Sequence, residues 1–238
     1  MTRPSTNNPD LLIVFVKAPR KGQVKTRLAA QIGEEFALRL YQAMVKDLME
    51  NIQPAREYDI HVLVWPHGTE NVVRNWLDWN GYISSQGSGD LGKKLFLAFK
   101  KSFRKGYKRV IIIGSDLPGI SSDLISSGLK RLHKYPLVLG PAVDGGYYLI
   151  GLNSLQPQLF SAMNWSTSGV LRETIRRAQQ SDLSFQLLKE LRDIDTFEDV
   201  AALWKIIQNR KRDDLIRSAD VIQDIMKQYH AKNTNFTP

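Results

Sequence analysis

The segment at residues 109–119, which reads RVIIIGSDLPG, constrains the fold of this chain more than any other. Residues 110–113 form an unbroken β-branched run, which is typical of a strand buried on both faces of a parallel sheet. Gly114 ends the run, and the Pro-Gly pair at its end forces a turn. The segment therefore predicts a central strand of an α/β sheet, with Asp116 directly after its carboxyl end.

Asp116 has two interpretations from this segment alone. In open α/β sheets, ligands bind outside the carboxyl ends of the strands, so a carboxylate delivered there is placed to contact one. An aspartate before a Pro-Gly turn also stabilises the turn by hydrogen bonding to nearby backbone, which needs no ligand. Other segments of the chain favour the first interpretation.

The 238 residues suffice for one α/β domain, since a domain takes roughly 100–200 residues. Residues 1–10 are polar and are expected to form a flexible arm, residues 11–207 the domain, and residues 208–238 a helical extension. The apolar stripe of that extension suits packing or a homo-oligomer contact. Strands are expected at residues 10–17, 59–65, 82–86, 109–114, 136–140 and 184–188, with a further β-like segment after residues 144–146 and helices between them.

Composition narrows the class of protein. The chain has no cysteine, which excludes a disulfide framework and a thiolate metal site. Its start lacks the basic and apolar parts of a signal peptide, and the longest apolar run near it is far shorter than the roughly 20 residues of a membrane span. We therefore expect a cytoplasmic protein without a membrane span. The net charge of +9 indicates anionic ligands, but no lysine and arginine run indicates a nucleic-acid tail.

A basic loop follows the first predicted strand. A loop between that strand and a helix N-terminus suits an anion, because backbone N–H groups and the helix dipole face it. Arginine also grips phosphate oxygens with two parallel hydrogen bonds. The loop is not a Walker A motif, since Val24 stands where that motif has glycine. It predicts a phosphate site, with a solvated basic loop as the alternative. Residues 11–33 contain no acid and five cations, which are Lys17, Arg20, Lys21, Lys25 and Arg27.

Two glycine-rich turns follow. In the first, Gly89 leaves room for close approach of a ligand to the backbone, whereas Asp90 is a good helix N-cap. In the second, Asp144, Gly145 and Gly146 lie between two apolar segments and are typical of a hairpin turn. The second turn also places another carboxylate at the edge of the sheet that already carries Asp116.

An acidic segment, DIDTFED at residues 193–199, lies where the last strand meets a helix. Capping by Thr196 and matching of the helix dipole account for Glu198 and Asp199. Neither capping nor the helix dipole accounts for Asp195. Four acids in seven residues supply the hard oxygen ligands that divalent cations prefer, so the segment predicts a contribution to a metal site.

Two kinds of chemistry find no support. The four histidines are scattered, and no G-x-S-x-G motif indicates a nucleophilic serine. The dinucleotide fingerprint G-x-G-x-x-G is missing after the first strand, which argues against hydride transfer.

Five sequence blocks, in their order along the chain, resemble those of a known family over about residues 11–207. This is the bacterial GT-A-like family of nucleotide-diphospho-sugar transferases, some of whose members are named arsenosugar-biosynthesis glycosyltransferases. The wider superfamily includes phospholactate and molybdopterin guanylyltransferases and cytidylyltransferases of sugar acids. The blocks are KAPRKGQVKTRL at 17–28, GDLG at 89–92, GSDLP at 114–118, LGPAVDGGYYLIGL at 139–152 and DIDTFED at 193–199.

The resemblance implies a three-layer α/β/α sandwich with a mostly parallel sheet and a nucleotide at its carboxyl edge. Asp116 would bind Mg²⁺ or Mn²⁺, with Asp195, or else Asp193, as the second metal ligand. Asp144 would lie by the sugar or acceptor with Gly145 and Gly146. The phosphate-binding residues would be Lys17, Arg20, Lys25 and Arg27 of the basic loop, with Gly89 and Asp90 near the substrate.

The sequence departs from the Asp-x-Asp pair of many metal-dependent GT-A glycosyltransferases, since Gly114 takes the first acidic place before Asp116. The leading hypothesis is a metal-dependent glycosyltransferase that takes a nucleotide-sugar donor and a small-molecule acceptor, with Asp144 as the base. The alternative is a nucleotidyltransferase that releases pyrophosphate, in which Lys25 and Arg27 are the most sensitive residues. A non-catalytic nucleotide- or nucleic-acid-binding module is the second alternative. The absence from the sequence of interleaved aromatic and basic residues, which such a module uses to bind nucleic acid, counts against this alternative.

Overall fold

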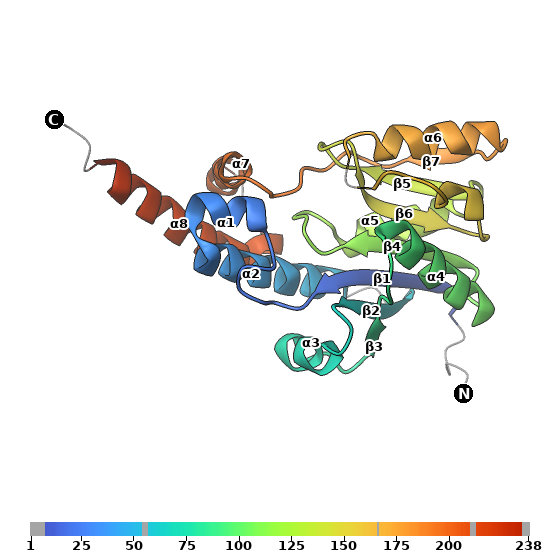
Figure 1. Cartoon of the computed structure of the whole chain (residues 1–238), viewed down its shortest axis with the longest axis horizontal. Coiled ribbons are helices and arrows are strands. Elements are labelled where there is room, and N and C mark those ends of the chain that lie inside the picture. Colours follow the sequence, from blue (N-terminus) through green and yellow to red (C-terminus); the bar gives the residue numbers. More distant parts are fainter. Residues whose placement is uncertain (1–7, 54–56, 166, 210–212, 235–238) are drawn as a thin grey trace.

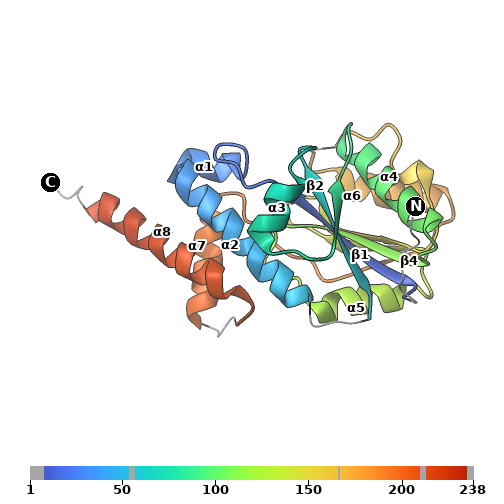
Figure 2. The same ribbon diagram turned by 90° about the horizontal axis from the view of Figure 1, so that it is seen from below.

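A seven-stranded β-sheet runs through the middle of the molecule, with helices on both faces (Figure 1, Figure 2). The computed structural model describes residues 8–53, 57–165, 167–209 and 213–234. Six of the seven strands confirm the ranges expected from the sequence to within a few residues, and the seventh is the β-like segment after the glycine turn. The strands are β1 (Asp10–Lys17), β2 (Asp59–Trp65), β3 (Tyr82–Ser85), β4 (Arg109–Gly114), β5 (Leu137–Pro141), β6 (Tyr147–Leu152) and β7 (Phe185–Leu187).

The order of the strands is β3-β2-β1-β4-β6-β5-β7. Among these seven strands, only β6 runs antiparallel to its neighbours, β4 and β5, so the described sheet is mostly parallel as expected. The turn at Asp144–Gly146 joins β5 to β6 as a hairpin, and Gly145 has φ +88° there. The strand order reverses between β1 and β4, which makes the carboxyl end of these two strands a topological switch point.

Helices connect the successive strands except β5 and β6, and apolar residues at helical spacing predict them. The longer ones are α2 (Glu34–Ile52), α4 (Leu91–Arg104), α5 (Ser122–Arg131), α6 (Val170–Gln180), α7 (Phe197–Asn209) and α8 (Ile216–Thr234). The shorter ones are α1 (Thr26–Ile32), α3 (Glu70–Leu77) and the 3₁₀ turns η1 (Pro157–Leu159) and η2 (Asp213–Leu215).

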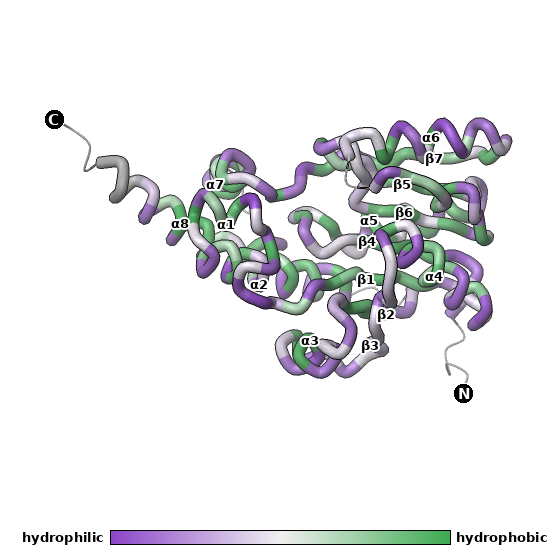
Figure 3. Tube along the Cα trace, in the orientation of Figure 1, coloured by the Kyte–Doolittle hydropathy of each residue, from purple (hydrophilic) through white to green (hydrophobic). Residues whose placement is uncertain are grey.

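Successive residues of the buried strands face opposite layers. In β1, Leu12, Val14 and Val16 pack with α2, α3 and α5, whereas Leu11 and Ile13 pack with α4 and α6. All five side chains are essentially inaccessible to solvent. The apolar colour therefore follows the sheet while polar residues lie on the outer helix faces (Figure 3). The unbroken apolar runs of β1 and β4 are explained by this burial on both sides.

A third apolar cluster lies beyond the sheet, where α1, α7 and α8 pack around the first half of α2 (Figure 1). It includes Leu40 and Met44 of α2 together with Ile222 and Ile225 of α8. The helix expected after residue 208 therefore packs on the domain. The division into an arm, a domain and an extension stays a prediction. Residues 1–7 of the expected arm lie outside the described residues, and Asp10 already belongs to β1.

No helix within the described ranges is both long and apolar enough to cross a bilayer.

Candidate active site

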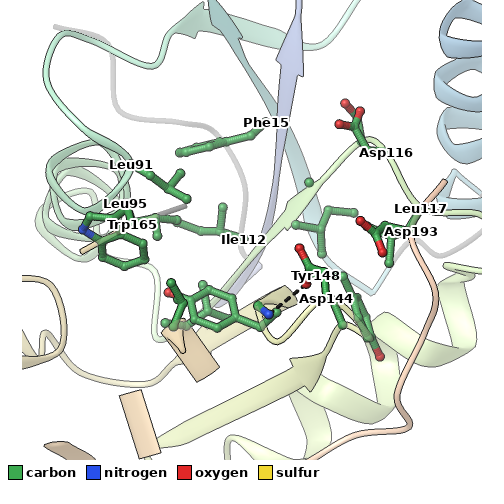
Figure 4. A pocket seen from close by; sticks show the side chains of 18 of the residues that line it. Phe15, Leu91, Leu95, Ile112, Asp116, Leu117, Asp144, Tyr148, Trp165 and Asp193 are labelled. Carbon is green, nitrogen blue, oxygen red and sulfur yellow. Dashed lines mark hydrogen bonds between the residues drawn. The ribbon is translucent and has the colours of Figure 1, made fainter. Parts of the chain in front are cut away.

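A cavity of about 850 Å³ opens at the carboxyl ends of β1 and β4, at the switch point of the sheet. Its lining divides into two chemically different parts. Figure 4 shows Asp116, Asp144 and Asp193 on one side and Phe15, Ile112 and the side chains beside them on the other. The apolar part is formed by Phe15, Leu91, Leu95, Ile112, Ile150, Trp165 and Val170. One end of the cavity can thus contact charged groups while the other contacts an apolar group.

The sheet topology explains how distant carboxylates meet at this edge. Asp116 follows β4, whose Gly114 pairs with Phe15 of β1, and so it lies above the end of the sheet. The segment after β7 continues along the same edge, because Leu191 donates a backbone hydrogen bond to Pro141 (3.0 Å) and accepts one from Val143 (3.1 Å). This path brings Asp195 to the basic loop.

Lys25 joins these two carboxylates. Its Nζ donates to Asp195 Oδ1 at 3.1 Å and lies 3.6 Å from Asp116 Oδ2. Only 2% of its side chain is exposed. Burial lowers the pKa of Lys25, but the charges of Asp116 and Asp195 outweigh it, and the net pKa is raised above the ordinary value. Lys25 is therefore a buried ammonium ion held by paired carboxylates.

Arg27 and Lys17 occupy the more open side of the basic loop. Arg27 Nη1 lies 3.7 Å from Asp195 Oδ2, yet 79% of its side chain is exposed. Lys17 also lines the cavity. The end of β1 is held by Tyr41 of α2, whose hydroxyl donates to the Lys17 carbonyl (2.8 Å) and accepts from the Lys17 N–H (2.9 Å). The two exposed cations are thus placed to meet an anion that enters from solvent.

The glycine turn supplies another carboxylate. Asp144 lines the cavity, and its Oδ1 accepts a hydrogen bond from the Gly146 N–H at 2.8 Å. Gly145 is required by packing, because a β-carbon on it would overlap the carbonyl oxygen of Ser168. Asp193 lines the cavity too, and burial followed by the charges of Asp144 and Asp195 raises its pKa. The carboxylates of this wall are therefore close enough to repel one another.

Of the acids at residues 193–199, Asp199 caps a helix, as the sequence predicts. The Asp199 carboxylate accepts the Thr196 N–H at 3.0 Å, and the Thr196 hydroxyl accepts the Asp199 N–H at 3.3 Å. This capping box begins α7 and leaves Asp195 facing the cavity.

Five of the residues expected at the site do not line the cavity themselves. Lys25 and Gly145 adjoin residues that do, whereas Asp90, Gly89 and Arg20 lie away from the cavity wall. Asp90 caps α4, since its side chain accepts the Lys93 N–H at 2.8 Å, which is the structural role foreseen for it. Gly89 adopts φ +105° in the same turn, and Arg20 is exposed on the loop. None of the three is among the lining residues, and their contact with a substrate stays a prediction.

Several residues that line the cavity were not predicted from the sequence. Trp65 ends β2, and the ammonium of Lys94 from α4 lies 5.2 Å from its ring centre. Trp165 packs against Gly92, where a β-carbon would overlap the indole nitrogen. Gln86 is buried and donates to the Leu63 carbonyl at 2.9 Å. Of these residues, only Trp65 had a signal in the sequence, because it directly precedes a proline at the end of a predicted strand. The positions of Gln86 and Trp165 at the cavity depend on which helix packs beside the sheet.

A divalent cation fits the donors at Asp116 and Asp195. Their oxygens face the same point, where Lys25 lies, and carboxylates are the ligands that Mg²⁺ and Mn²⁺ prefer. No group of three or more histidine, cysteine or acidic side chains in the described ranges is arranged to hold a metal. The pair of Asp116 and Asp195 matches the way Mg²⁺ is commonly held, by one or two carboxylates together with substrate phosphates.

Comparisons with known proteins give relatives described as transferases. Over 145 residues the chain is 25% identical to 2-phospho-L-lactate guanylyltransferase of Methanobrevibacter ruminantium, and the match covers 58% of this chain. The chain spans about three fifths of the length of that curated relative, 62%.

A crystal structure from Desulfovibrio desulfuricans G20, provisionally described as a nucleotide-diphospho-sugar transferase, superposes with a TM-score of 0.87. The two are 29% identical, and the match covers 93% of this chain and 98% of that one. A cytidylyltransferase from Leptospira borgpetersenii has a TM-score of 0.57 and 15% identity, over 94% of this chain and 96% of that one, which shows a shared fold.

The family model of uncharacterized proteins conserved in bacteria, DUF2064, matches residues 48–167, about half of the chain. These comparisons confirm the resemblance and the GT-A-like three-layer fold that the sequence blocks imply. The chain belongs to the DUF2064 family.

Proposed function

We propose that this protein is a metal-dependent transferase that acts on a nucleotide-activated substrate. The observation that carries the proposal is the meeting of Lys25 with Asp116 and Asp195, which are 91 and 170 positions away in sequence, beside the cavity at the switch point. Such convergence of acids and cations at the ligand-binding edge of an α/β sheet suits a substrate that carries phosphates.

The charges of the site match the charge that develops in the reaction. When a bond to a phosphate oxygen breaks, negative charge grows on the departing oxygens, and a divalent ion on Asp116 and Asp195 would stabilise it. Arg27 and Lys17 would bind the outer phosphate oxygens from the open side of the loop. Positioning and electrostatics would then provide most of the rate acceleration, with little covalent work for the protein.

The leading form of the proposal is glycosyl transfer from a nucleotide-diphospho-sugar to a small-molecule acceptor. The similarity to the provisionally described sugar transferase from D. desulfuricans supports it. Asp144 is the candidate base, because it is exposed to the cavity and fixed by the Gly146 N–H. It would take the proton of an acceptor hydroxyl, and the apolar end of the cavity would hold an apolar part of the substrate.

Nucleotidyl transfer is the second form, and the similarity to the guanylyltransferase supports it. A phosphate of the small molecule would attack the α-phosphate of a nucleoside triphosphate, and pyrophosphate would leave. Arg27 would be the most sensitive residue, because it is the exposed arginine beside the carboxylates.

The test measures thermal stabilisation by nucleoside triphosphates and nucleotide sugars, each with and without Mg²⁺ or Mn²⁺. A ligand at 100 times its dissociation constant adds about 2.7 kcal/mol, which a melting curve resolves. We expect a metal-dependent shift that Asp116→Asn removes and that the exposed, remote control Asp220→Asn retains. A shift with a nucleotide sugar favours the glycosyl form, and a shift with a triphosphate alone favours the nucleotidyl form.

Two results contradict the proposal. One is a full metal-dependent shift in Asp116→Asn. The other is binding that needs neither metal nor Asp116 and weakens steeply with salt, which indicates a non-catalytic binding module.

A further inference from the structure

The ammonium of Lys25 holds the position between the two carboxylates that a divalent cation needs. Its Nζ is 3.1 Å from Asp195 Oδ1 and 3.6 Å from Asp116 Oδ2, and it lies 3.5 Å from the Asp116 carbonyl oxygen. Mg²⁺ takes its oxygen ligands at about 2.0–2.1 Å. An ion bound to both carboxylates would therefore lie in contact with the ammonium, and two cations cannot share these oxygens without strong repulsion.

The backbone of Lys25 points to a special role for its side chain. Lys25 is the N-cap of α1 with φ +47° and ψ +46°, a left-handed conformation that glycine or asparagine adopts more readily, and its side chain caps no N–H. A buried lysine is also costly unless it is paired. The local backbone alone would favour glycine or asparagine at this position. The pairing with the carboxylates therefore explains why a lysine stands there.

The surroundings favour one buried cation at this point. Asp193 raises the local negative charge further, while Arg27 contacts only Asp195 and is mostly exposed. Without Lys25, the two carboxylates would face each other with no buried positive charge between them.

We propose that Lys25 is an internal counter-ion that a divalent cation replaces, so that metal binding releases the Lys25 ammonium toward the phosphates of the bound nucleotide. The inference rests on the proposed function for the identity of the anion. It makes Lys25 a positioning residue that keeps Asp116 and Asp195 together before substrate arrives, and it makes metal and lysine competitors for the same oxygens.

The first experiment titrates the protein with Mn²⁺ alone and follows free Mn²⁺ by electron paramagnetic resonance. Lys25→Met keeps the length of the side chain and removes its charge. We expect it to bind Mn²⁺ at least ten-fold more tightly than the wild type. Lys130→Met removes the same charge from the exposed face of α5 and should bind like the wild type. Equal or weaker Mn²⁺ affinity in Lys25→Met overturns the inference.

A second experiment uses the wild-type protein and does not depend on the folding of the variant. Reductive methylation with formaldehyde and a borohydride, read by mass spectrometry, reports how accessible each lysine is. Lys25 should react slowly without metal, and saturating Mn²⁺ should raise its rate at least five-fold while the rate of Lys130 stays constant. An unchanged or lower rate at Lys25 overturns the exchange.

The outcome separates this inference from the proposed function. If Asp116→Asn abolishes Mn²⁺ binding and nucleotide-dependent stabilisation while Lys25→Met leaves Mn²⁺ affinity unchanged, the exchange is wrong and the transferase proposal stands. If no form of the protein binds Mn²⁺ alone while nucleotide-dependent stabilisation still needs both the metal and Asp116, the exchange is wrong and the metal-dependent proposal stands.

Discussion

Lys25 and Arg27 belong to the same loop but differ strongly in the exposure of their side chains. The sequence assigns both to phosphate binding, because both are cations before a helix N-terminus. In the structure Lys25 is enclosed by carboxylates, whereas Arg27 reaches into solvent beside the cavity. Lys25 combines a left-handed backbone, with φ +47°, and a buried side chain, and a linear pattern of charges contains no such information.

His61 gives a test at the scale of one residue. It is buried against Tyr82, with a ring distance of 4.1 Å, and burial followed by the charge of Lys105 lowers its pKa to about 4. The unfolded chain binds a proton near the ordinary pKa of 6.5, while folded His61 stays neutral until about pH 4. The contribution of neutral His61 to stability is therefore complete above pH 6.5 and is lost as the pH falls from 6.5 to 4.

We expect the wild type to lose about 2 kcal/mol more than His61→Gln between pH 7 and pH 4.5, measured by urea unfolding. His67→Gln is the matched control, because 85% of the His67 side chain is exposed and its removal should leave the wild-type pH dependence. Parallel pH profiles for the wild type and His61→Gln would contradict the assignment.

At the scale of elements, the turn between β5 and β6 is held by backbone contacts to the first turn of α6 and to the segment before it. The Gly145 carbonyl accepts the Leu171 N–H at 3.0 Å, and a β-carbon at Gly145 would overlap the Ser168 carbonyl oxygen. Gly68 has nearly the same φ, +84°, and a β-carbon added there would meet nothing within 4 Å in the described part of the chain. The two glycines separate the cost of a left-handed backbone from the cost of a clash.

Gly68→Ala should cost about 1–2 kcal/mol, because a residue with a β-carbon disfavours a left-handed backbone. Gly145→Ala should cost at least about 1 kcal/mol more, because the backbone of Ser168 must also move. Urea unfolding of both variants measures the difference. Equal losses would show that the turn and the Ser168 segment separate freely.

The elements themselves could be largely predicted. Unbroken apolar runs identified β1 and β4, and Thr196 with Asp199 identified the start of α7, because burial and capping depend on neighbours in sequence. The apolar end of the cavity could not be predicted, since Leu95, Ile112 and Trp165 line it together only because α4 packs beside the sheet. Asp116 and Asp195 could be predicted as site residues, while their pairing with Lys25 could not.

At the scale of the whole molecule, the C-terminal helix is joined to the domain by a buried carboxylate. Asp47 of α2 accepts the Ser218 N–H at 2.8 Å and the Ser218 hydroxyl at 2.6 Å, and it also accepts the Arg217 N–H at 3.2 Å. These amides belong to the first turn of α8, whose N–H groups have no partner within the helix. A carboxylate from one helix therefore caps another.

Asp47→Ala should lower the free energy of unfolding by about 2–4 kcal/mol, because it leaves buried donors without a partner. Glu50→Ala is the matched control one turn away, since Glu50 binds Arg217 at 2.5 Å from an exposed position and such pairs contribute about 1 kcal/mol or less. Similar losses in the two variants would show that α8 is held by its apolar face alone. The homo-oligomer expected through this helix stays a prediction.

The sequence by itself determined the class of this protein: alternating buried strands and amphipathic helices, a basic loop after β1, and acids after β4 and β7. These features depend on local periodicity, turn residues and charge, which are written along the chain. Only the tertiary structure decided that Lys25 lies between Asp116 and Asp195, that Asp90 caps a helix instead of lining the cavity, and that the cavity has an apolar end. The physical reason is that the direction of a side chain depends on backbone φ and on neighbours from distant segments, and these contacts exist only once the sheet order brings the strand ends together.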